Sequence, residues 1–235
     1  MSMVTQSETN PAIAARAEAL RDDQLRARRA RIDRMFAVLL VVQYIAAIAG
    51  ALTVSPYAWE GKTRIVHMHV WVAVLGGAGI IILPILLAFL RPGHTITRHV
   101  IAASQMLSSA LLIHLTGGRI ETHFHVFGSL AFLAFYLDWP VLITATIIVA
   151  ADHFLRGIFW PESVYGVANP EWWRFLEHAG WVAFEDVFLI WSCVMGERDF
   201  AMSSLRQAEA EHFSEQEQLK SAALEMTLAE MQASA

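Results

Sequence analysis

The sequence predicts an all-α polytopic membrane bundle of about six transmembrane helices, with a long cytoplasmic C-terminal helix. Two observations carry this prediction. Hydrophobic residues make up 56% of the 235 residues, and the mean hydropathy is +0.44. Charged residues make up only 17% and gather at the two ends of the chain and in short connections between apolar runs. A soluble domain of this length rarely has this composition and layout, whereas a membrane domain with two polar ends does.

Six apolar runs predict the spanning helices, at about 35–53, 66–90, 98–116, 120–137, 140–159 and 173–195. Each is close to the ~20 residues that cross the hydrocarbon core at a rise of about 1.5 Å per residue. The fourth run is marginal in length, and Pro84 predicts a kink in the second. The connections are short, which favours an antiparallel up-and-down bundle.

The polar ends set the expected domain boundaries and orientation. Residues 1–34 form a basic N-terminal segment that ends in a cluster of arginines, 35–195 form the transmembrane domain, and 196–235 form a polar helix. An even number of spans puts both termini on one side, and the excess of Lys and Arg on that side favours the cytoplasm. We therefore expect a bacterial inner-membrane protein with both termini cytoplasmic.

The segment 196–235 predicts a continuous helix that leaves the membrane. It contains no proline, is rich in Glu, Gln, Ala and Leu, and repeats Leu205, His212, Leu219 and Met226 every seven residues. This spacing favours a parallel two-stranded coiled coil, and so a homodimer through the helix. A second register through Leu224 competes with it, and a single solvated helix is the alternative.

Histidines carry the chemistry that the sequence predicts. Seven of the ten fall near the outer ends of five predicted helices, whereas chance would scatter them over both leaflets. These seven are His67, His69, His114, His123, His125, His153 and His178. Imidazole is the commonest protein ligand for zinc, copper and iron, so the seven predict a metal site.

Carboxylates accompany these histidines. Glu185 lies seven residues after His178, so both are expected on one face of a helix about two turns apart. We expect Glu185 to be a metal ligand, because an ionisable residue in hydrocarbon indicates function by default. Supporting roles around the ligands are expected for Glu121, Asp152 and Asp186, with Arg156 as the ion-pair partner of Asp152.

Helix geometry limits the number of ligands. Residues two apart on a regular helix point about 200° apart, so the members of the pairs His67/His69 and His123/His125 cannot face one site unless the chain is non-helical there. We therefore expect about five ligands from the seven. Copper or iron is the expected metal, and zinc and haem b stay open. The non-metal alternatives are a proton relay and a polar pocket for a small ligand.

Three stretches of the sequence resemble a known kind of module. They are "HLTGGRIETHFHVFGSLAFLAFYLDWPVLI", "AADHFLRGIFWPESVYG" and "EHAGWVAFEDVFLI". They resemble the membrane-embedded sensory region found ahead of bacterial histidine kinases, chemoreceptors and cyclic-dinucleotide enzymes. The resemblance covers roughly 35–195. It implies a signal-input module that uses the C-terminal helix as its transmission element.

The expected function is therefore a transmembrane sensor of a metal, a diatomic gas or a redox state. Its expected partners are the lipid bilayer, a second copy of the chain and a cytoplasmic output domain or protein, and not nucleic acid. The runner-up is a membrane-bound metal-dependent oxygenase or oxidoreductase with Glu185 as base or bridging ligand. A haem-binding sensor and an ion transporter are further alternatives, although the apolar inner halves of the spans argue against transport.

Overall fold

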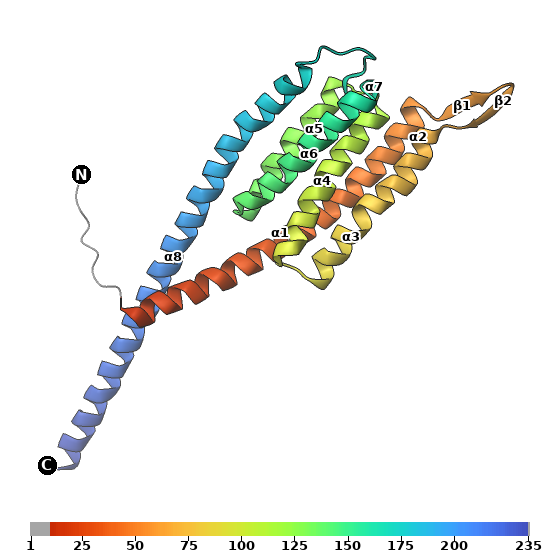
Figure 1. Cartoon of the computed structure of the whole chain (residues 1–235). Helices are drawn as coiled ribbons and strands as arrows, with labels where there is room; N and C mark the ends of the chain where they lie inside the picture. The colour runs from red at the N-terminus through yellow and green to blue at the C-terminus, as the bar shows by residue number, and fades with distance from the viewer. Residues whose placement is uncertain (1–9, 235) are drawn as a thin grey trace. The chain divides into compact units, whose positions relative to one another are not determined.

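The structure is a computed structural model that describes residues 10–234. It is all-α apart from one short β-hairpin (Figure 1). The order is α1 Pro11–Val54, β1 Tyr57–Glu60, β2 Thr63–Val66, α2 Met68–Trp71, a π-helical turn Val72–Gly76, α3 Gly77–Leu90, α4 Thr95–Leu115, α5 Ile120–Leu133, a 3-10 turn Ala134–Tyr136, α6 Trp139–Phe159, α7 Glu162–Tyr165 and α8 Arg174–Ala233. The chain divides into two compact units, one formed by Arg26–Met195 and one that joins the N-terminal residues up to Leu25 to Gly196–Ala235.

Several helices have the length and composition needed to cross a membrane. Among the described residues, five qualify: α1, Met68–Leu90, α4, α6 and α8. The predicted fourth span is shorter than expected, because α5 has only 14 residues before the 3-10 turn begins. The structure thus confirms an all-α protein with several helices that are long and apolar enough to cross a membrane.

The connection between the first two spans contains structure that the sequence analysis did not anticipate. The strands β1 and β2 pair antiparallel, with Tyr57 opposite Val66. The second span then starts at α2, passes through the π-helical turn and continues as α3 through Pro84. This span therefore has an irregularity at Val72–Gly76 that the sequence does not predict, in addition to Pro84, where a kink is predicted.

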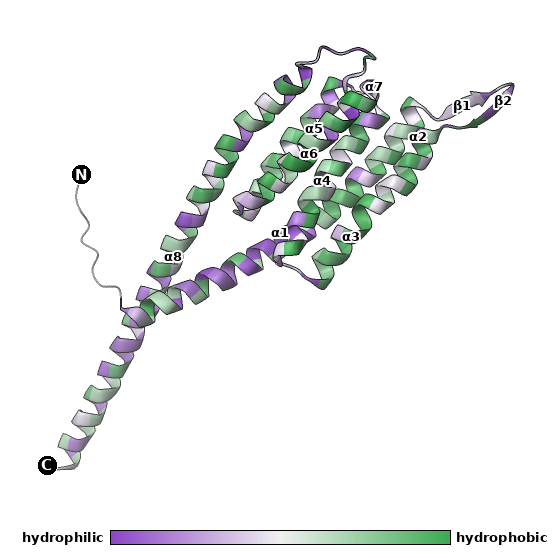
Figure 2. Ribbon diagram, in the orientation of Figure 1, coloured by the Kyte–Doolittle hydropathy of each residue, from purple (hydrophilic) through white to green (hydrophobic). Residues whose placement is uncertain are grey.

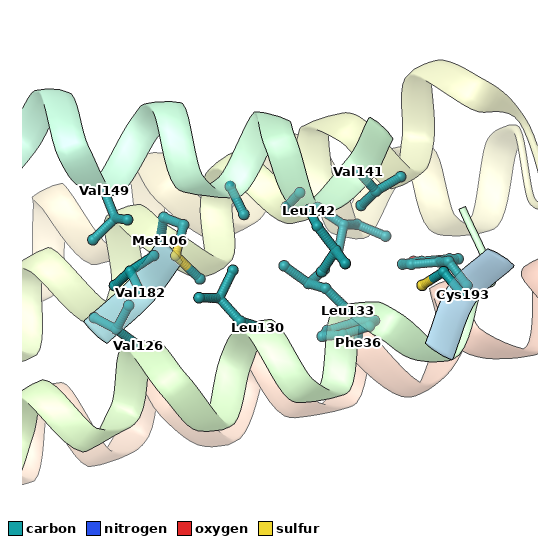
Figure 3. Packing of buried hydrophobic residues seen from close by; sticks show 14 of the residues in the cluster. Phe36, Met106, Val126, Leu130, Leu133, Val141, Leu142, Val149, Val182 and Cys193 are labelled. Carbon is teal, nitrogen blue, oxygen red and sulfur yellow. The ribbon is translucent and has the colours of Figure 1, made fainter. Parts of the chain in front are cut away.

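The core of the larger unit surrounds α4, which packs against α3, α5 and α6. Residues from five helices meet in one apolar cluster, including Phe36, Met106, Leu130, Leu142 and Cys193 (Figure 3). Burial of this cluster fixes the faces that α4, α5 and α6 turn toward one another. The helices on the periphery instead carry exposed apolar side chains, as expected where they face lipid. Figure 2 shows that the residues of these spans are largely hydrophobic.

A network of charged and polar groups closes one end of the bundle, which we call the lock end. Asp33 is fully buried and accepts hydrogen bonds from the Gly93 amide at 2.6 Å and the Tyr136 hydroxyl at 2.7 Å. Arg98 forms a buried ion pair with Asp138. Every group in this network has a partner, which is what burial of charge requires.

The opposite end of the bundle carries the histidines, and we call it the histidine end. Arg98 and His114 lie at the two ends of α4, roughly 24 Å apart at the helical rise. At the histidine end, the turn after α4 packs tightly on the turn after α7. Gly118 has φ +72°, and a Cβ on it would lie 2.4 Å from the amide nitrogen of Gly166. Only glycine fits this contact, which positions α7 beside the histidines.

The smaller unit joins the start of α1 to the C-terminal part of α8. Arg16 Nε contacts Glu211 Oε2 at 2.8 Å, and Gln24 Nε2 donates to Gln207 Oε1 at 2.9 Å. Ala208 is buried beneath these polar contacts. The two polar ends of the chain therefore meet one another.

Candidate functional site at the histidine end

The structure sorts the seven predicted histidines into three groups. His123 from α5, His153 from α6 and His178 from α8 form one cluster, which we call the histidine triad. His67, His69 and His114 form a second cluster beside the β-hairpin. His125 belongs to neither cluster and lies in a separate hydrogen-bond network.

The three rings of the triad face one another. Their centroids are 5.3 Å apart for His123 and His178, 5.5 Å for His123 and His153, and 6.0 Å for His153 and His178. His123 and His153 are buried, at 4% and 5% exposure, and His178 is half-buried. Three helices thus bring three imidazoles to one point.

All three rings are oriented in the same way. Each Nδ1 lies within hydrogen-bond distance of the carbonyl oxygen four residues earlier, at 2.9 Å for His123 to Arg119, 3.1 Å for His153 to Val149 and 3.0 Å for His178 to Arg174. A carbonyl oxygen can only accept, so Nδ1 must carry the proton. In the neutral ring Nε2 then has a free lone pair. The Nε2 atom of His123 is buried and has no hydrogen-bond partner.

An apolar cavity of about 70 Å³ adjoins the triad. Besides the three rings, its walls are mostly aliphatic or aromatic, and Val126, Val149 and Val182 among them lie at one end of the apolar core (Figure 3). The space exceeds the minimum of about 10–15 Å³ for one water molecule. A wider groove shares His123 and His178 with the cavity and adds Arg174 and Glu177, which gives a route to the triad.

Tyr165 from α7 packs against the triad, a contact that the sequence analysis missed. Its ring lies 5.5 Å from that of His178, edge to face. Its hydroxyl is buried without a hydrogen-bond partner, and burial raises the pKa of this hydroxyl above its usual value. The Tyr165 hydroxyl is therefore a protonated donor at neutral pH with nothing to donate to. No spacing rule connects Tyr165 to the histidines, because the tight contact between Gly118 and Gly166 brings α7 to the site.

The second cluster depends on a break in the helix. His67 lies before α2 in an extended conformation, with φ −63° and ψ 145°, and its Nδ1 accepts a hydrogen bond from the His69 amide. This is the non-helical geometry that the HxH spacing requires if both rings are to meet, and their centroids lie 4.3 Å apart. The His69 ring then contacts His114 at 4.9 Å.

A polar chain connects the two clusters. Asp152 forms a bidentate ion pair with Arg156, as predicted, at 2.7 and 2.5 Å. Asp152 Oδ2 also lies 3.3 Å from Nδ1 of His153 in the triad. On the other side, Arg156 donates to the Ser163 hydroxyl at 2.8 Å, which contacts His114 Nδ1 at 2.9 Å. The sequence analysis missed Ser163, since a serine in the short helix α7 between two predicted spans gives no signal of this role.

His125 has both ring nitrogens occupied. Its Nε2 lies 2.9 Å from Gln43 Nε2, and its Nδ1 lies 2.7 Å from the Ser109 hydroxyl. Because His125 is two residues after His123 on a regular helix, the two rings point to different sides, as the helix geometry predicts. The contacts of His125 resemble those of an interhelical hydrogen-bonding residue.

The other predicted acids lie away from the triad. Glu121 is exposed and 3.5 Å from Arg119. Glu185 lies two turns along α8 from His178, and its Oε2 atom is buried without a partner. Asp186 Oδ2 accepts a hydrogen bond from the Thr146 hydroxyl at 2.5 Å, and Thr146 lines the cavity beside the triad. Among residues 10–234, no three His, Cys, Asp or Glu side chains are already close enough to hold a metal ion.

The chain is similar in part to a curated protein, Transducer protein Htr8 of Halobacterium salinarum. The two are 35% identical over 81 residues, which is 32% of this chain and 13% of the relative. The match thus spans about an eighth of the transducer's length. No family model and no solved structure matches this chain. The similarity relates part of the chain to a sensory transducer, and the long apolar helices indicate a membrane protein.

Proposed function

We propose that this chain is the membrane-embedded signal-input module of a sensory transducer. In this proposal the signal enters at the histidine end, and α8 carries it to a cytoplasmic output domain or protein. The observation that carries the proposal is the extent of α8, which holds His178 of the triad near its start and continues without a break to Ala233. A shift of α8 at the triad is a change that an attached output domain can detect.

The contact between the two polar ends supports the expected topology. The Arg16–Glu211 ion pair joins the start of α1 to the C-terminal part of α8, which supports one side of the bilayer for both. In the proposed topology the number of crossings is even, with α5 and the 3-10 turn as the sixth. The basic residues that precede the first span favour the cytoplasm of a bacterial inner membrane for this side.

A parallel homodimer through the end of α8 completes the proposed module. From Phe213 onward, α8 is exposed, and it presents large apolar side chains there, including Leu219 and Met226 at 71% and 64% exposure. These two residues are seven apart, which is the spacing of a coiled-coil contact. A second copy of the same helix would bury both.

The test attaches a histidine-kinase output domain after residue 234 and changes the helical phase of the tail. Insertions of one to seven residues into the exposed stretch after Phe213 rotate everything beyond by about 100° per residue. We expect kinase output to oscillate with insertion length and to recover near seven. Output that is constant across the series, or that fails to respond to added copper, zinc, iron, chelator, oxygen or reductant, would overturn the proposal.

A membrane metalloenzyme is the second candidate, favoured by the cavity beside the triad. The acid expected to serve it, Glu185, is not among the described residues that line this cavity. An enzyme would retain turnover after deletion of 213–234, whereas an input module would lose its output. This deletion therefore separates the two functions.

A further inference from the structure

We propose that His123, His153 and His178 bind one first-row transition metal ion through their three Nε2 atoms, with a further coordination position directed at the cavity. In this proposal three of the seven candidate histidines are metal ligands, and they hold a single ion. The geometry of the three rings supports the site by itself, whereas its role as the entry point of the signal rests on the proposed function.

The ring orientation is the first argument. A histidine that binds a metal through one nitrogen usually donates the other N–H to a carbonyl or carboxylate, which fixes its tautomer and aim. All three triad rings make this contact, each to the carbonyl oxygen one turn earlier. The position of the three Nε2 lone pairs is therefore fixed before a metal ion binds, as in a preorganised site.

The unpaired nitrogen is the second argument. His123 is 4% exposed, and its Nε2 is buried without a partner, which costs free energy unless a ligand occupies it. The neighbouring walls are mostly apolar, as at Val126 and Val182, and the Thr146 hydroxyl that also lines the cavity is engaged by Leu142 and Asp186. A metal ion needs a lone pair of this kind.

The ring spacing is the third argument. With metal–nitrogen bonds of about 2.0–2.1 Å, three imidazoles around one ion have centroids about 5–5.5 Å apart. The triad has 5.3, 5.5 and 6.0 Å. The longest separation, between His153 and His178, is thus up to about 1 Å too wide. Binding would draw His178, and with it the start of α8, toward α6, and this is the movement that the proposed function requires.

The ligand chemistry limits the metal. Three neutral imidazoles without thiolate suit zinc, copper, iron or nickel, and not magnesium or calcium, which prefer oxygen. Among divalent ions, copper should bind more tightly than zinc. Three protein ligands leave a position open for a water or a small exogenous ligand, and the cavity of about 70 Å³ has room for one.

The second histidine cluster does not fit such a site as well. The Nδ1 atom of His67 accepts from an amide, so its neutral ring carries the proton on Nε2. His67 therefore offers no free lone pair there. The His125 nitrogens are both engaged, and this makes His125 a matched control on the same helix as His123.

The test uses the full chain in detergent, purified with a tag that contains no histidine, stripped with chelator and then titrated with Zn²⁺ or Cu²⁺. We expect one equivalent per chain by elemental analysis and a visible spectrum typical of tetrahedral cobalt when Co²⁺ is used as the probe. His123→Asn, His153→Asn and His178→Asn should each weaken binding by more than about 100-fold, because losing a ligand costs more than losing a group that orients one. His125→Asn should change affinity less than about threefold.

Three outcomes would overturn the site: no binding by the wild type, an equal loss in His125→Asn, or a Soret band that identifies haem. His178 is half-buried, so its variant keeps the test decisive if the two more buried variants do not fold. Metal binding with a phase-independent output would leave the site intact and remove the proposed function. Phase-dependent output without metal binding would remove the site and leave the proposed function intact.

Discussion

The two ends of the bundle both bury polar groups, but they satisfy them differently. At the lock end, Asp33 accepts from Gly93 and Tyr136, and Arg98 pairs with Asp138. At the histidine end, His123 Nε2 and the Tyr165 hydroxyl are buried without partners. Buried polar groups without partners cost free energy, so the lock end is satisfied as structure, whereas the histidine end is where we propose the binding site.

The largest expected effect follows from breaking the lock end. Arg98→Ala leaves Asp138 as an uncompensated charge in a buried position, and such losses cost about 3–5 kcal/mol. We expect the variant to unfold at clearly lower denaturant in detergent. The control at the other end is Arg119→Ala, since the Arg119–Glu121 pair is about 64% exposed and exposed pairs contribute little to stability. Equal losses in the two variants would remove the distinction between the ends.

The next effect tests how the histidine end is closed. Gly118→Ala should destabilise the bundle by more than about 2 kcal/mol, because it adds a backbone clash with Gly166 to the cost of a left-handed conformation. Gly117→Ala is the control, with φ +70° but nothing within 4 Å of the new Cβ, so it should lose only about 1–2 kcal/mol. Thermal unfolding in detergent measures both. If the two variants unfold alike, the contact of Gly118 with Gly166 contributes nothing.

A third prediction concerns the proposed metal site. Asp152→Asn removes the carboxylate charge beside Nδ1 of His153 and should weaken metal affinity about 10-fold, the lower end of the range for a group that orients a ligand. Competition with a chelator of known affinity measures the change. Glu121→Gln is the control, because Glu121 is exposed and pairs with Arg119 instead. An unchanged affinity in Asp152→Asn would show that this carboxylate does not act on the triad.

The smallest effect contrasts a water-exposed ion pair with the buried pair of the lock end. The hydrogen bond from Arg16 lowers the pKa of Glu211 below its usual value. The ionised form is therefore favoured in the folded state, so its stabilisation is present at neutral pH and is lost as the pH falls through the lowered pKa. Glu211→Gln should shift the thermal midpoint little at pH 7 and remove this acid dependence. A large shift at pH 7 would mean that the Arg16–Glu211 pair contributes more to the stability of the fold than surface ion pairs usually contribute.

The fold class and part of the candidate site could be predicted from the sequence, because they depend on local properties of the chain. Apolar runs and the helix period are local properties, so the spans, the Asp152–Arg156 pair and the divergence of His123 from His125 were all predictable. The division of the histidines into two clusters depends on helix rotation and on the extended backbone at His67, which no residue spacing encodes. Tyr165 ends the short helix α7, which the contact between Gly118 and Gly166 positions, so only the structure could place it.

The hydrogen bonds from the triad rings to their own helix backbones have one more consequence. An imidazole tied to a carbonyl of its own helix follows that helix when it moves, so the distance between two rings is a measure of the distance between two helices. Linkage then runs in both directions: if bound metal favours one spacing of α6 and α8, a partner that favours the same spacing raises metal affinity by the same factor. The affinity of the triad is in this sense a property of the whole assembly, set in part by whatever binds the far end of α8.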